Sequence, residues 1–544
     1  MKIARILWVA VAVLSGAVLP AAGGRHPAGE DSERVGKVSF PISCNAAAQV
    51  TFNQAVAWLH SFEYEEAQKA FGEVASEDPQ CAMAHWGLAV SLYHELWEHP
   101  SANDLKQGRA ELAKAREVGS KTPRESEYID AASAFFQDSG QGSGHDSGQG
   151  STKMNYQARA TAYCQAMGRL YAHYPDDVEA GAFDALSLIA SEPPHDHTLA
   201  NRKQAIAILQ KLFAQEPDHP GLAHYLIHAA DVPELAPLGL EAARRYAKIA
   251  PSSPHALHMP SHIFTRLGLW QDSIASNIAS AAAAQTPMAI HMGGTGHAAH
   301  ATDFLDYAYL QIGRDADARR MVAQLKAISG IKPDLLAFSV TKFESRYAIE
   351  THDWKRAARL TAPAGSELGV QAMALWTAAM GAARSGDAAA ARQALDKMAA
   401  VRTKMVAGHD EYGSHAYETE YDEASAWVDL AEGKKAEALT TMRSTADRED
   451  AAGVDDLIMP AREMLGDMLL AAGSPHDAFL AYQTALKESP NRFDGLYGAA
   501  KAAQLSGHPD AAKEYYARLQ QNCDHAEERA ELREARTFLA ANGG

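Results

Sequence analysis

The chain has 544 residues, which is enough for several domains or one extended array of repeats, and its 47% of hydrophobic residues excludes wholesale disorder. A formal net charge of −18 disfavours nucleic acid and anionic membrane surfaces as partners, because these polyanions would be repelled. We therefore expect a folded protein that binds no nucleic acid.

The first 23 residues have the three parts of a secretory signal peptide. Lys2 and Arg5 supply the positive start, residues 6–19 the apolar core, and residues 21–23 a cleavage zone of small side chains. The apolar core is short for a membrane span, and no later stretch approaches the length of one. We expect residues 1–23 to be removed from an exported, periplasmic protein whose mature chain has no transmembrane segment.

Two of the four cysteines flank the first predicted helical pair. Cys44 and Cys81 each lie just ahead of a helix, and an oxidising compartment would allow them to form a disulfide. No two cysteines are spaced as Cys-x-x-Cys, the arrangement typical of redox sites and zinc knuckles.

Helical periodicity dominates from residue 48 onwards, and no β-strand pattern competes with it. Residues 24–47 form an N-terminal extension, and residues 48–136 form the first helical pairs, of which "YEEAQKAFGEVASEDP" is an example. Residues 137–153 are rich in Gly, Ser and Gln and are too polar to pack, so we expect a flexible loop there.

The central region, residues 154–332, contains a pair of histidines that occurs twice. His224 and His228 are four residues apart, and so are His258 and His262. Residues four apart lie on one face of a helix. Each histidine of the first pair recurs 34 residues later in the second pair. The histidines therefore occupy equivalent positions in two adjacent helix-turn-helix units.

Other polar residues lie around these pairs. His291 and His297 lie on a Gly-rich connection, for which we expect a solvated loop. Asp231 and Arg266 each lie one helical turn after a histidine pair. Three further residues continue the polar stripe in the next helical pair: His300, Asp303 and Tyr307.

The repeat is clearest in the C-terminal array, residues 333–526. Two antiparallel helices approach closely only where side chains are small, so Gly466 and Ala478 mark the contact and Tyr482 fills the space beside it. Residues 527–544 are expected to form a capping helix. The repeat interval is 34 residues: Gly473, Ala478 and Tyr482 of one helical pair recur as Gly507, Ala512 and Tyr516 in the next.

The two histidine pairs are separated by the same interval of 34 residues. A helix-turn-helix unit that recurs at this interval resembles the tetratricopeptide repeat. The segments "AHYLIHAADVP", "APSSPHALHMPSHIFTRLGLW" and "ATDFLDYAYLQ" also resemble motifs of exported bacterial tetratricopeptide-repeat proteins. The resemblance implies an all-α fold, a right-handed superhelical solenoid in which the first helix of each pair lines a concave groove. It implies no particular activity.

In such a solenoid the histidine pairs should face the concave groove. Neighbouring first helices pack about 8–10 Å apart, so side chains from both can share one small ligand. The predicted ligand-binding groove consists of His224, His228, Asp231, His258, His262, Arg266, His300, Asp303 and Tyr307.

Three interpretations of this groove remain open. Imidazole and carboxylate groups suit a divalent transition metal such as Zn, Cu or Ni, with His224, His228, His258 and His262 as ligands. The same groups could instead bind a small polar ligand or a peptide. In the third interpretation the histidines only pack the repeats together.

Sequence motifs of common enzymes are missing from the chain. There is no His-Glu-x-x-His, no Gly-x-Ser-x-Gly and no Gly-rich phosphate loop. We therefore predict an exported repeat scaffold that binds a small polar ligand or a metal ion in its groove and has room for a protein partner. The alternatives are a metal-dependent hydrolase that uses the His and Asp groups and a purely structural scaffold for protein interaction.

Overall fold

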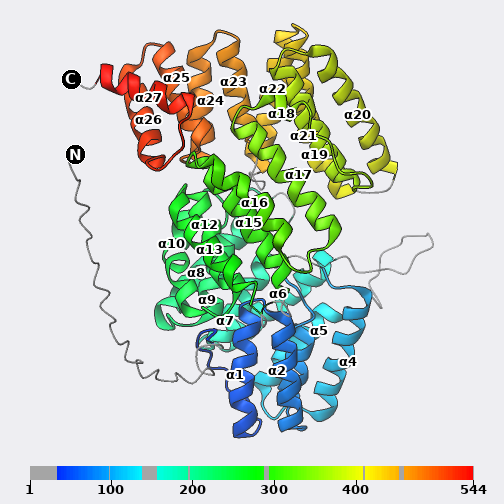
Figure 1. Cartoon of the computed structure of the whole chain (residues 1–544). Coiled ribbons are helices and arrows are strands. Elements are labelled where there is room, and N and C mark those ends of the chain that lie inside the picture. Colours follow the sequence, from blue (N-terminus) through cyan, green and yellow to red (C-terminus); the bar gives the residue numbers. More distant parts are fainter. Residues whose placement is uncertain are drawn as a thin grey trace, which may run out of the picture.

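The computed structural model describes residues 34–96, 99–137, 156–193, 196–286, 289, 293–407, 411–452 and 459–542. Within these ranges every regular element is a helix. Figure 1 shows the helices stacked side by side, from the blue N-terminal pairs at the bottom to the yellow and red C-terminal pairs at the top. The predicted signal peptide and residues 138–153 of the predicted loop lie outside the described residues.

The helices follow one another as antiparallel neighbours along the chain. The first half contains α1 (Ala46–His60), α2 (Tyr64–Glu77), α3 (Ala82–Val90), α4 (Ala102–Val118), α5 (Pro123–Phe136), α6 (Tyr156–His173), α7 (Val178–Ala190), α8 (Ala200–Gln215), α9 (Pro220–Ala230), α10 (Ala236–Ile249), α11 (Pro254–His258), α12 (Pro260–Arg266) and α13 (Trp270–Ala283). The second half contains α15 (Gly294–Gln311), α16 (Asp315–Ala327), α17 (Pro333–Glu350), α18 (Trp354–Ala357), α19 (Leu368–Arg384), α20 (Ala388–Ala407), α21 (Glu411–Ala431), α22 (Lys435–Ala452), α23 (Ala461–Ala471), α24 (Pro475–Glu488), α25 (Phe493–Leu505), α26 (Pro509–Asn522) and α27 (Ala530–Ala541).

The C-terminal pairs show why this sequence forms helix-turn-helix repeats. A Cβ added at Gly466 of α23 would lie 2.7 Å from the Tyr482 ring of α24, so the two helices can approach only because the side chain is missing. Ala478 is fully buried at the same contact. Gly473 turns the chain between the two helices with a φ of +77°, a conformation that favours glycine. The predicted all-α solenoid of tetratricopeptide-type helical pairs is therefore confirmed.

No described helix combines the length and the apolar composition that a membrane crossing needs. The division of the repeat array at residues 153/154 and 332/333 stays a prediction.

The N-terminal segment makes contacts far along the chain that a repeat pattern does not contain. Before α1, the backbone N–H of Lys37 donates to the carbonyl of Asp218, and the carbonyl of Arg34 accepts from the N–H of Ser252. Helix α1 itself packs against α9. As a result, the turn between α1 and α2 lies over the helices that carry the histidines.

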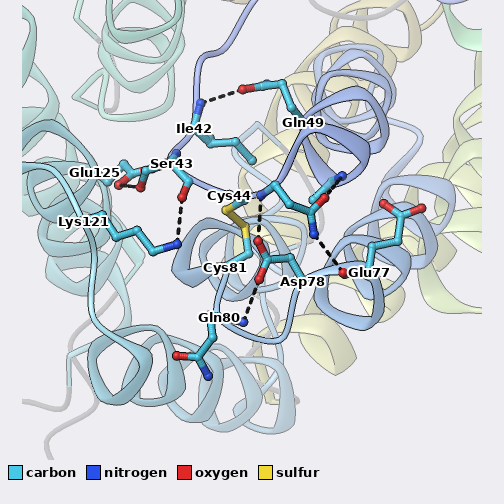
Figure 2. Close-up of a disulfide and its surroundings, with 12 residues drawn as sticks. Ile42, Ser43, Cys44, Gln49, Glu77, Asp78, Gln80, Cys81, Lys121 and Glu125 are labelled. Atoms are coloured by element: carbon cyan, nitrogen blue, oxygen red, sulfur yellow. Dashed lines mark hydrogen bonds between the residues drawn. A yellow bond between two sulfur atoms is a disulfide. The ribbon is translucent and has the colours of Figure 1, made fainter.

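A disulfide joins Cys44 and Cys81, the pair that the sequence singled out. Figure 2 shows it between the start of α1 and the start of α3, with polar contacts on both sides. The backbone N–H of Asn45 donates to Asp78 over 2.7 Å. The hydroxyl of Ser43 donates to Glu125 over 2.5 Å. The disulfide therefore anchors the N-terminal extension to the first helical pairs.

We expect the double variant Cys44→Ser/Cys81→Ser to unfold at lower urea concentration than the wild type. The two cysteines are separated by 37 residues, and closing a loop of that length stabilises a folded chain by about 4 kcal/mol in the chain-entropy treatment. Cys164→Ser is the matched control, because Cys164 is not disulfide-bonded. Equal urea midpoints for the double variant and the wild type under oxidising conditions would contradict the prediction.

Candidate metal centre

The central histidines are buried, and this corrects the expectation of an open groove. His224 is 0% exposed, His228 7% and His258 2%, whereas the side chain of His262 is 19% exposed. The turn between α1 and α2 covers α9 and α11, so the first-helix face that carries these rings lies inside the protein. The repeat period nevertheless does bring the histidines together, in two neighbouring clusters.

The first cluster, called the inner cluster here, consists of His224 and His228 from α9 and His255 from α11. The Nε2 atom of His224 lies 3.0 Å from the Nε2 of His228 and 3.0 Å from the Nε2 of His255. All three ligand atoms lie within 4.8 Å of one another. Three ring nitrogens therefore point at one small volume.

The protonation of His224 follows from its other nitrogen. Its Nδ1 lies 2.7 Å from the carbonyl oxygen of His60 at the end of α1. A carbonyl only accepts hydrogen bonds, so Nδ1 carries the proton and the Nε2 of the neutral ring is a bare lone pair. Fixing a ring through Nδ1 to a backbone carbonyl is how metal-binding histidines are commonly oriented.

Aromatic rings close the inner cluster. Phe62 lies with its ring centroid 4.4 Å from that of His224, 5.5 Å from His228 and 5.8 Å from His255. On another side, Tyr246 stacks on His224 at 5.1 Å. The backbone of Phe62 has a φ of +57°, which is strained for a bulky side chain and places the ring over the histidines.

Burial keeps these rings neutral. It lowers the pKa of His224 to about 3 and the pKa values of His228 and His255 well below the ordinary value of 6.5, with the neighbouring histidines adding to the effect. A neutral imidazole is the form that binds a metal ion.

The second cluster, called the outer cluster here, consists of His258, His262 and His300. The helix divides at Pro260, which has no N–H to donate, so His258 ends α11 while His262 lies in α12. The Nε2 atoms of His258 and His262 are 2.9 Å apart. His300 of α15 adds a third ligand atom within 4.8 Å of both.

Both facing rings of the outer cluster are fixed through their Nδ1 atoms. His258 Nδ1 lies 2.7 Å from Oδ1 of Asn277, whose own NH₂ group donates to the carbonyl of Ser273. His262 Nδ1 lies 2.8 Å from the carboxylate of Asp231. Each Nδ1 therefore donates, and the two Nε2 atoms face each other.

Asp231 and Arg266, predicted to line the groove, support this cluster instead. Arg266 Nε donates to Asp231 over 2.9 Å. Burial alone would raise the pKa of Asp231, but His262 and Arg266 outweigh it and lower the pKa below its ordinary range. The carboxylate thus remains charged and orients His262.

A third group of titratable side chains has all of its donors and acceptors paired. Glu179 accepts from His60 Nε2 over 2.7 Å and from His219 Nε2 over 2.9 Å. The hydroxyl of Tyr225 donates to His60 Nδ1, and the backbone N–H of Leu222 donates to His219 Nδ1. This network joins α1, α7 and α9 and holds the carbonyl of His60 against the inner cluster.

We expect Glu179→Gln to lower the free energy of unfolding by about 1.5–3 kcal/mol at pH 7, the usual contribution of a hydrogen bond to a charged group. Burial alone would raise the pKa of Glu179, but His219 and His60 outweigh it and lower the pKa below the ordinary 4.5. A lowered pKa stabilises the fold above the unfolded value, and this contribution is lost as the pH falls below about 4.5. Urea melts between pH 7 and pH 3 should therefore show the difference between wild type and Glu179→Gln shrinking below about pH 4.5, and a difference that stays constant down to pH 3 would contradict the prediction.

Two predicted groove residues belong to other networks, which corrects their assignment. Asp303 accepts from Arg346 over 2.7 Å and from Lys342 over 3.2 Å. Tyr307 accepts from Arg492 over 2.6 Å. Their positions in the repeat are as expected, but cations from later helices bind them.

Several residues of the site were not predicted from the sequence. His255 has no counterpart in the preceding repeat, because the equivalent position is Gly221, where an added Cβ would lie 2.5 Å from the His60 ring. His297 is no solvated loop residue, since it lies in α15 with its ring 5.5 Å from that of His255. His291, expected in the same loop, lies outside the described residues. Asn277 carried no signal, because its role depends on a single tertiary contact.

Comparison with known proteins adds little to this picture. No family model matches the chain, and no curated protein does. Among solved structures, human IFIT1, determined as a dimer with m7Gppp-AAAA, is 11% identical with a TM-score of 0.37, covering 88% of this chain and 97% of its own. Yeast Tom70 is 11% identical with a TM-score of 0.34, covering 91% and 96%.

A third structure, the tetratricopeptide domain of P58(IPK), is 14% identical with a TM-score of 0.20 and covers 67% of this chain and 99% of its own. Similarities this distant carry no argument about ligand or partner, and the RNA in the IFIT1 structure is a ligand of that protein. The fold assignment rests on the helical pairs described above, and the narrower resemblance to exported bacterial repeat proteins stays a prediction. The chain is an all-α solenoid with two neighbouring histidine clusters in its central region, of which the inner one is buried.

Proposed function

We propose that this helical-repeat scaffold binds a transition-metal ion in the inner cluster, through the Nε2 atoms of His224, His228 and His255. One observation carries the proposal. The Nε2 of His224 is deprotonated because Nδ1 donates to the carbonyl of His60, yet it faces two further ring nitrogens at 3.0 Å. A single lone pair cannot accept two strong hydrogen bonds along its axis, whereas one metal ion would satisfy all three nitrogens.

The spacing of the nitrogens supports this assignment. Two nitrogens that are each about 2.05 Å from one ion lie about 2.9 Å apart at a right angle and about 3.3 Å apart at a tetrahedral angle. The two Nε2 separations of 3.0 Å lie between these values. The side chains would therefore need only small rotations to bind an ion.

The ligand set narrows the choice of metal. Neutral imidazoles in a site closed by Phe62 and Tyr246 suit Zn, Cu or Ni, whereas Mg and Ca prefer oxygen ligands. Because aromatic rings cover this cluster, the ion would have a structural role and would tie α9 to α11. The covered position argues against the metal-dependent hydrolase as a use of this cluster.

We also propose that the protein is exported to the periplasm and that it binds a protein partner. Export to the periplasm would put the site in a compartment where disulfides form, and the Cys44–Cys81 disulfide supports that location. A protein partner on the outside of the solenoid is the common use of such scaffolds.

The experiment measures metal content. Full-length protein without a His-tag is stripped with EDTA, dialysed against Zn(II) or Cu(II) and analysed by inductively coupled plasma mass spectrometry. The proposal expects His255→Ala to bind one ion fewer than the wild type. His173→Ala is the matched control, since the His173 side chain is 64% exposed on α6 and contacts Glu127. Equal metal content in His255→Ala and wild type would overturn the proposal.

A further inference from the structure

The outer cluster differs from the inner cluster in its access to solvent. His258 is buried and the side chain of His262 is 19% exposed, but His300 is exposed. Phe304 packs against this cluster, with its ring centroid 4.8 Å from those of both His258 and His262. The outer cluster is therefore covered in part by an aromatic ring, while one of its three histidines is exposed to solvent.

The facing nitrogens of the outer cluster need a proton or a metal ion between them. Asn277 and Asp231 hold the Nδ1 protons, so two lone pairs would otherwise meet at 2.9 Å. A proton between the rings would also remove this repulsion. A metal ion requires no protonated ring and also uses the third nitrogen, from His300.

We infer that the outer cluster is a second transition-metal site, in which His258, His262 and His300 bind the ion and solvent supplies an exchangeable ligand, either water or a small anion. Three histidines with one open coordination position are the arrangement of metal sites that act on an external molecule. The inference stands on its own residues and does not require an ion in the inner cluster.

The two sites are neighbours but can be separated by mutation. Helix α11 supplies His255 to the inner cluster and His258 to the outer cluster, and these two ring centroids are 6.5 Å apart. No ligand is shared between the clusters. Removing His300 should empty only the outer site, and its exposure means that the substitution should leave the fold intact.

The test uses full-length, tag-free protein loaded with Co(II), whose visible absorption reports its ligands. We expect wild type to bind one ion at each cluster, and His300→Ala and His255→Ala to bind one ion each. Azide should change the visible spectrum of wild type and of His255→Ala, but not that of His300→Ala. Asn277→Leu, which removes the acceptor for His258 Nδ1, should weaken the outer site about 10–100-fold and leave the inner site unchanged.

The outcomes separate the two proposals. If wild type and His300→Ala both bind one ion and His255→Ala binds none, the outer site is wrong and the inner site stands. If His300→Ala binds none while His255→Ala binds one, the inner site is wrong and the outer site stands. Two ions with a spectrum that azide does not change would overturn the exchangeable position.

Discussion

Replacing Arg492 by Met should lower the free energy of unfolding by about 3–5 kcal/mol at pH 7, the usual cost of leaving a buried charge without its partner. Arg492 is fully buried just before α25, and its guanidinium donates to Glu350 of α17 over 2.7 Å and to Glu463 of α23 over 3.0 Å. It also donates to Tyr307 of α15. One cation thus connects four helical elements, and Met keeps much of its volume without its charge.

The pH dependence distinguishes this charge effect from a packing effect. In the variant, Glu350 and Glu463 lose their cation, and protonation would remove the charges that remain buried. The destabilisation should therefore be largest at neutral pH and smaller as the pH falls towards 5, in urea melts followed by circular dichroism.

Arg536→Ala is the control for Arg492→Met. Arg536 pairs with Glu528 on the surface, where both side chains are about half exposed, and such pairs contribute about 0–1 kcal/mol. A similar loss of stability in both variants would show that the buried network has no special role.

The second large effect concerns metal-linked stability. Any ion that binds only the folded chain stabilises it, by about 4 kcal/mol when the free metal is 1,000 times the dissociation constant. We expect Zn(II) or Cu(II) to raise the melting temperature of the EDTA-stripped wild type, and EDTA to reverse the change.

Variants of the inner cluster should remove the part of this effect that the inner site contributes. His224→Ala lacks the ring that faces both other nitrogens, so its melting temperature should respond to metal less than that of the wild type, with the remaining response coming from the outer cluster. His173→Ala should respond like the wild type. If His224→Ala shows the full response, the stabilising ion is bound elsewhere.

Individual residues show how far sequence reasoning reaches. The equivalence of His224 with His258, and of His228 with His262, follows from the repeat period, and the structure places both pairs on first helices close together. The same reasoning could not divide the rings into two clusters, because His255 has Gly221 at the equivalent position of the preceding repeat and drew no attention. His300 is the equivalent of His255 in the next repeat, yet the structure places it with His258 and His262. The repeat period also grouped Tyr307 with the histidines, because it predicts the helix face on which a residue lies. It does not predict that Arg492, just before α25, donates a hydrogen bond to Tyr307.

The sequence by itself determined the helices, their pairing and the face on which the histidines lie. These features depend on local periodicity and on small residues such as Gly466 and Ala478, which act within one or two repeats. Only the tertiary structure decided that the histidines are buried and how each ring is oriented. Phe62 and the carbonyl of His60 come from a turn far earlier in the chain, between α1 and α2, and no local pattern records such a contact.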